Sequence, residues 1–99
     1  MPYKLIRDRI PEIVQAKGEV IHTRVANNEE YTTALRQKLI EEAKEFAEKG
    51  DPEELADLFE VIDAILANES FSREEIQERQ MIKAAQRGGF TQKILLELP

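Results

Sequence analysis

The breaker Gly50-Asp51-Pro52 constrains the fold most, because it separates two amphipathic segments and leaves almost no linker between them. Glycine readily ends a helix, aspartate is a common N-cap, and proline is tolerated at the first helical position. Before the breaker, apolar residues recur at three- and four-residue intervals from Leu35 to Ala47, and after it from Leu55 to Leu66. The pattern predicts two helices folded back on each other as a hairpin.

Acidic residues are spaced symmetrically about this turn. In a tight hairpin Glu45 lies opposite Glu54, and Glu42 lies opposite Asp57. Carboxylates brought that close repel one another and raise one another's pKa unless a cation neutralises them. Oxygen ligands in this number suit Mg²⁺ or Mn²⁺. The spacing therefore predicts a divalent-metal site that awaits an anionic, phosphate-bearing ligand.

A plainer interpretation of the same acids is a set of surface ion pairs, such as Lys38 with Glu41 or Glu45 with Lys49. Glu42 favours the metal interpretation, because it shares its row with Leu35, Leu39 and Phe46 and so faces the partner helix. A buried carboxylate needs a cation or hydrogen-bond donors.

Cap and breaker residues also predict where helices begin and end in the rest of the chain. Helices are predicted over 11–17, from the cap at 27–28 to Gly50, from Pro52 to about 66, and from the cap Ser72 to Gly88. Alternation over 19–25 predicts a short strand, and the isoleucine- and leucine-rich tail 90–98 predicts a second strand beside it. The expected fold is mainly α, a helical bundle with short β-strands near both ends.

Composition narrows the function classes. Ninety-nine residues predict a single domain over 1–99, and no apolar run approaches the roughly 20 residues that span a bilayer. The N-terminus has no apolar signal region, so we expect a cytoplasmic protein with no membrane partner. The absence of cysteine excludes thiolate metal sites, and a net charge of −6 argues against binding to a nucleic-acid polymer.

Four motifs carry a family resemblance: Glu41-Glu42-x-x-Glu45, the Glu54-Leu-Ala-Asp57 segment, the opening Lys4-Leu-Ile-Arg-Asp-Arg-Ile-Pro11, and Lys83-x-x-x-Arg87-Gly-Gly-Phe90. Together they resemble the all-α nucleoside triphosphate pyrophosphatases. This MazG-like group also includes phosphoribosyl-ATP pyrophosphohydrolase and dimeric dUTPases. The opening and late motifs are similar to those of a short phage- and bacterium-borne branch of that group.

The resemblance implies roles for individual residues. The implied magnesium ligands are Glu42, Glu45, Glu54 and Asp57, with Glu41 turned outward. Glu60-x-x-Asp63 is a competing second acidic pair. The candidates to accept a proton from the attacking water are Glu41, Glu45 and Glu60. Phosphate-binding candidates are Lys83 and Arg87, four apart on one helix face, together with Lys4 and Arg7.

The implied activity is Mg²⁺-dependent hydrolysis of a nucleoside triphosphate, canonical or non-canonical, to the monophosphate and pyrophosphate, as a house-cleaning reaction. Two alternatives stay open: a pyrophosphohydrolase for phosphoribosyl-ATP or another nucleotide, and a non-catalytic helical module that binds nucleotide or protein. A hairpin with one further helix leaves apolar surface uncovered, so we expect a homodimer or homotetramer.

Overall fold

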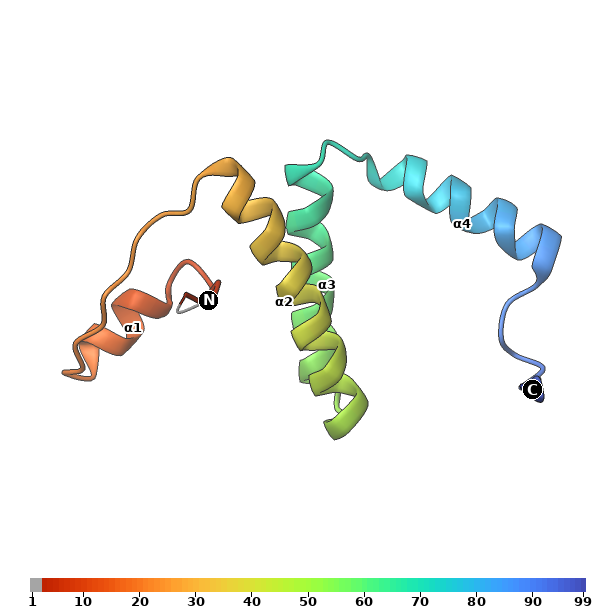
Figure 1. The fold of residues 1–99 in the computed structure, drawn as a ribbon, viewed down its shortest axis with the longest axis horizontal. Helices are drawn as coiled ribbons and strands as arrows, with labels where there is room; N and C mark the ends of the chain where they lie inside the picture. Colours follow the sequence, from red (N-terminus) through yellow and green to blue (C-terminus); the bar gives the residue numbers. More distant parts are fainter. Residues whose placement is uncertain (1–2) are drawn as a thin grey trace.

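The computed structural model describes residues 3–99 and contains four helices over that range. They are α1 (Ile10–Ala16), α2 (Asn28–Lys49), α3 (Pro52–Asn68) and α4 (Arg73–Arg87) (Figure 1). No helix in the described part of the chain has the length and apolar character needed to cross a bilayer. The mainly α prediction is confirmed.

The α2–α3 hairpin is the centre of the molecule. Asn27 caps α2 by accepting a hydrogen bond from the Glu30 backbone N–H, and the Glu30 side chain accepts one from the Asn27 N–H in return. Arg24 also pairs with Glu30, and its hydrogen bond is the main reason that the pKa of this carboxyl falls to about 2. The start of the long helix is thus fixed by side-chain chemistry that involves only residues near it in sequence.

The turn of the hairpin follows the sequence signals. Gly50 ends α2 in the left-handed region at φ 67°, and Asp51 caps α3 by accepting a hydrogen bond from the Glu54 N–H, 3.1 Å away. Pro52 occupies the first helical position. This compact turn lets α2 and α3 pack along their length, the one extensive helix–helix contact among the described residues.

The two predicted strands are wrong for the described residues. Residues 19–25 and 90–98 are irregular, and no strand is present between residues 3 and 99. A strand needs a partner for its backbone N–H and C=O groups. Figure 1 shows why these two segments do not pair with each other. Residues 19–25 lie near α1, while the tail lies beyond the far end of α4.

The chain is extended, with dimensions of 52 × 31 × 27 Å. Its radius of gyration is 17.6 Å, against about 13 Å for a compact domain of this length. Leu35, 3% exposed, and Val61, 8% exposed, are the only buried hydrophobic residues in the described range, and they lie on α2 and α3. The core of one copy is therefore small.

Candidate metal centre

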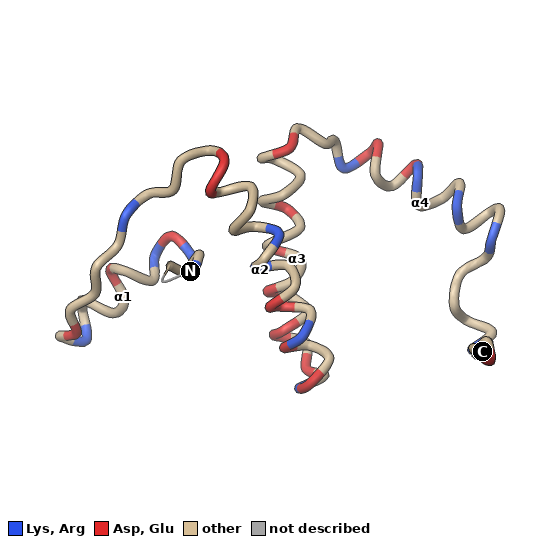
Figure 2. Tube along the Cα trace, in the orientation of Figure 1, with Lys and Arg blue, Asp and Glu red and all other residues tan. Residues whose placement is uncertain are grey.

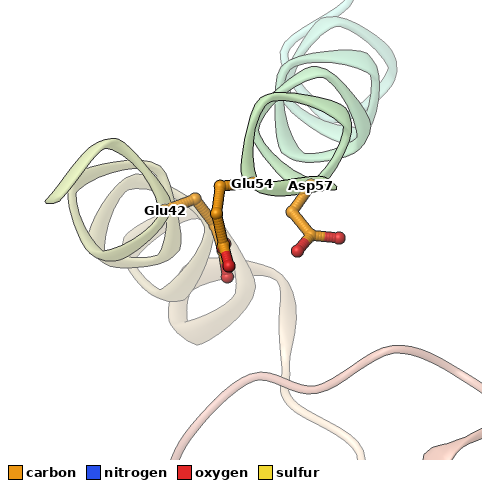
Figure 3. A group of neighbouring side chains, drawn as sticks. All are labelled: Glu42, Glu54 and Asp57. Carbon is orange, nitrogen blue, oxygen red and sulfur yellow. The ribbon is translucent and has the colours of Figure 1, made fainter. Parts of the chain in front are cut away.

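Three carboxylates converge between α2 and α3 near the turn. Glu42 comes from α2, and Glu54 and Asp57 come from α3; their side chains point toward one another (Figure 3). One oxygen from each lies within 4.8 Å of the others. We call this group the acid cluster.

Helix geometry explains the convergence. Glu42 lies seven residues after the buried Leu35, on the same side of α2, and is only 8% exposed. Glu54 and Asp57 are three residues apart and share a face of α3 that turns toward Glu42. Because Asp51 starts α3 directly after the turn, its first two turns lie level with the end of α2.

Each member of the cluster also has a cationic neighbour. Lys38 lies 3.4 Å from Glu42, and Lys49 lies 3.4 Å from Glu54. Arg7, from the segment before α1, donates a hydrogen bond of 2.7 Å to Asp57. These three cations offset the repulsion among the carboxylates and show how the chain can hold them together.

The remaining members of the acidic motif lie outside the cluster. Glu41 pairs with Lys4 at 2.7 Å, and this hydrogen bond lowers the pKa of Glu41 and raises the pKa of Lys4. Glu45 pairs with Lys49 at 3.0 Å and is the main cause of the raised pKa of Lys49. The structure thus places Glu41 and Glu45 beside the cluster, each in an ion pair.

A groove of about 660 Å³ runs over the cluster, between the hairpin and residues 4–10. Glu42, Asp57 and Glu60 line one side, and Lys4, Arg7 and Arg9 line the other. Acids from the hairpin and bases from the N-terminal segment therefore face the same space. No cation pairs with Glu60 among the described residues.

The competing pair Glu60 and Asp63 does not form a second cluster in the described chain. Asp63 instead pairs with Arg73 at the start of α4. Glu60 lines the groove, but the acids that lie within 4.8 Å of Glu42 in the cluster are Glu54 and Asp57.

Lys83 and Arg87 do not reach this groove within one chain. They lie on α4, which extends away from the hairpin, and neither is among the residues that line the groove (Figure 2). Figure 2 also shows acidic residues gathered on the hairpin and basic residues repeated along α4. In a single copy only Lys4 and Arg7, of the four predicted phosphate-binding residues, lie at the acids.

Sequence reasoning missed the part that Lys38 plays. The plainer interpretation of the sequence pairs Lys38 with Glu41 alone, yet Lys38 also lies near the buried Glu42 and lines the groove. Its four-residue spacing from Glu42 was the available signal. Tyr31 also lines the groove, about two helical turns before Lys38 on α2.

The donor set of the cluster fits a divalent cation. Three carboxylates from two helices, one of them nearly buried, offer the hard anionic oxygens that Mg²⁺ and Mn²⁺ prefer. Glu42, Glu54 and Asp57 are the residues that would hold the ion. Comparison of the chain with models of protein families, with curated proteins and with solved structures finds no match.

Proposed function

We propose that this protein is a Mg²⁺-dependent nucleotide pyrophosphohydrolase, which converts a nucleoside triphosphate to the monophosphate and pyrophosphate. The observation that carries the proposal is the acid cluster, in which Glu42, Glu54 and Asp57 bring oxygens within 4.8 Å of one another. The resemblance of four motifs to the MazG-like pyrophosphatases supplies the reaction type. A bound Mg²⁺ would offset phosphate charge and make a water molecule more acidic.

The groove supports an anionic substrate. Lys4, Arg7 and Lys38 line it together with Glu42 and Asp57 of the cluster, so a triphosphate there would meet two of the metal ligands and three cations. Arg7 presents a planar, permanently charged guanidinium that suits phosphate oxygens. The N-terminal segment thus has the chemistry to orient the phosphate chain over the carboxylates.

Glu60 is the best-placed group to accept a proton. It lines the groove beside Asp57, is exposed, and has no cationic partner in the described chain, whereas Glu41 and Glu45 are both in ion pairs. A carboxylate free of such partners keeps its oxygens available to a water molecule. We therefore assign the general base to an Oε atom of Glu60.

The test is pyrophosphate release from a panel of canonical and modified nucleoside triphosphates and phosphoribosyl-ATP, with and without Mg²⁺. Asp57→Asn and Glu42→Gln should each lower the rate more than about 100-fold, a loss typical of removing one preorganised electrostatic group. Glu53→Gln is the matched control, because Glu53 is an exposed acid on α3 that lies outside the cluster and the groove.

Electron paramagnetic resonance measures Mn²⁺ binding directly. It therefore distinguishes a loss of metal binding from a loss of hydrolysis. Asp57→Asn should weaken Mn²⁺ binding, whereas Glu60→Gln should slow hydrolysis and leave Mn²⁺ binding intact. Hydrolysis that is unchanged in Asp57→Asn would exclude the cluster as the active site. Nucleotide binding without any turnover would favour the non-catalytic module instead.

A further inference from the structure

The chain before α1, residues 3–9, runs along one side of the groove without forming a helix or a strand. We call this segment the strap. Its side chains make three contacts with later parts of the chain: Tyr3 with Arg24 at 4.4 Å, Lys4 with Glu41 at 2.7 Å, and Arg7 with Asp57 at 2.7 Å. The α2–α3 hairpin holds the one extensive helix–helix contact among the described residues, so the packing of α1 does not anchor the strap.

The ion pairs of the strap are open to water. The side chain of Lys4 is 64% exposed and that of Arg7 is 56% exposed. Exposed ion pairs contribute little to stability, because water screens the charges and two flexible side chains must be held still. Leu5 is half-buried, and the other residues of the strap are exposed. The strap is therefore held by contacts that are easily exchanged for others.

Arg7 differs from the two lysines beside the acid cluster. Lys38 and Lys49 belong to α2, whose packing against α3 fixes their backbone. Arg7 reaches Asp57 from a segment fifty positions earlier in the sequence. Displacement of either lysine moves only a side chain, whereas displacement of Arg7 can move the whole strap.

A divalent ion at the acid cluster would displace Arg7. Its two positive charges repel the guanidinium, and it takes up the carboxylate of Asp57 to which Arg7 donates. We propose that binding of a divalent ion releases the strap from Asp57, and that a phosphate-bearing anion on this ion draws the strap back through Lys4 and Arg7. The site then fills in a fixed order, with the metal ion first and the anion second. This inference rests on the metal site of the proposed function, but it does not require hydrolysis.

Electrostatics sets that order. Without a metal ion, an anion in the groove meets the carboxylates of Glu42 and Asp57, which repel it, and Arg7 is already engaged. With the ion in place, the anion offers oxygens to which a free guanidinium forms short, charge-assisted hydrogen bonds. Leu5 lines the groove beside Leu35, and this apolar contact keeps the released strap close enough to return.

Distances between two nitroxide labels, measured by pulsed electron paramagnetic resonance, follow the strap directly. The chain has no cysteine, so labels attach only to introduced thiols. Asp8→Cys with Ala67→Cys places one label on the strap and one on α3. Glu48→Cys with Ala67→Cys is the matched control, because both labels then lie on the hairpin. All three positions are exposed.

Mg²⁺ alone should lengthen and broaden the distance between the strap and α3. Inorganic tripolyphosphate added with excess Mg²⁺ should restore a short, narrow distribution, and tripolyphosphate without Mg²⁺ should leave the distance of the free chain unchanged. The hairpin pair should keep one distance throughout. A strap distance that ignores Mg²⁺ in a chain that binds Mn²⁺ would overturn the inference and leave the metal site standing. A chain that binds no Mn²⁺ would overturn both.

Arg7→Gln tests whether this one contact holds the strap. Without Mg²⁺ the labelled variant should already show the long, broad distribution, and Mg²⁺ should change it no further. Arg9→Gln is the matched control, because Arg9 borders the same groove but pairs with Glu12, and it should respond to Mg²⁺ as the wild type does. A short, narrow distribution in Arg7→Gln would overturn the assignment of the contact to Arg7.

Discussion

At the scale of the residue, two of the three cations beside the acid cluster also line the groove. Arg7 bonds to Asp57 and Lys38 lies near Glu42. If a divalent ion takes over the charge of these carboxylates, the guanidinium of Arg7 loses its partner beside the groove. The same side chain can then bind substrate phosphate. The proposed site thus exchanges one set of ion pairs for another, which limits the cost of assembling so many charges.

This exchange makes a prediction for Arg7→Gln. Because Arg7 competes with the metal for Asp57, its removal should tighten binding of Mn²⁺ alone, by up to about five-fold for an exposed ion pair. It should also raise KM for the nucleotide, because a phosphate ligand is lost. Mn²⁺ titration and steady-state kinetics measure the two effects separately.

Arg9→Gln is the control for this prediction. Arg9 also borders the groove but pairs with Glu12 at 2.5 Å instead of with a cluster member. Its replacement should leave Mn²⁺ binding unchanged. Weaker Mn²⁺ binding in Arg7→Gln would show that Arg7 supports the metal ligands instead of competing with the ion.

Spacing about the turn was enough to predict that Glu42 and Asp57 converge, because helix geometry fixes which faces meet. It was not enough for Glu45, which pairs with Lys49 and lies outside the cluster. A glutamate near the end of a helix can turn toward a lysine four residues later or toward the facing helix. The choice depends on rotamers and neighbours that a sequence pattern does not encode. The catalytic and ligand roles of these residues stay predictions.

At the scale of the element, the starts of α2, α3 and α4 and the ends of α2 and α4 were predictable because they depend on local chemistry. Asn27, Asp51 and Ser72 each accept a hydrogen bond from the backbone N–H three residues later, and Gly50 and Gly88 follow the ends of α2 and α4. The two predicted strands were wrong because a strand depends on a distant segment and not on local chemistry. A strand over 19–25 requires a distant segment as its partner, and no local signal brings the tail there.

The turn provides a prediction for Gly50→Ala. Gly50 has φ 67°, and an alanine side chain in the left-handed region costs about 1–2 kcal/mol. A Cβ added at Gly50 would have no atom within 4 Å, so no steric clash adds to that cost. The free energy of unfolding, measured with urea, should fall by about 1–2 kcal/mol with an unchanged slope.

Gly89→Ala tests whether backbone conformation is the cause. Gly89 lies outside the left-handed region, and a Cβ added there would also have no atom within 4 Å. This change should therefore have little effect on stability. An equal loss in both variants would mean that flexibility of the chain, rather than the sign of φ, sets the cost.

At the scale of the whole molecule, the direction of α4 could not be predicted from the sequence. Only residues 69–72 connect it to α3, and Ser70 adopts φ 57°, a conformation that serine seldom takes. Nothing in the pattern of residues 73–87 specifies where this helix lies. The ion pair between Arg73 and Asp63 links the start of α4 to α3.

The self-association expected from the sequence predicts that thermal stability depends on protein concentration. If folding and association are coupled, mass action raises the melting temperature as the chain is concentrated. Circular dichroism melts over a hundred-fold range of concentration should show a steady upward shift of the midpoint for the wild type. A midpoint that does not change with concentration would mean that single copies are stable alone.

The acid cluster joins the two arms of the hairpin, because Glu42 belongs to α2 while Glu54 and Asp57 belong to α3. The unfolded chain does not hold these three carboxylates together, so an ion bound by all three would favour the closed hairpin over the unfolded chain. Occupancy of the site and order of the hairpin would then rise and fall together.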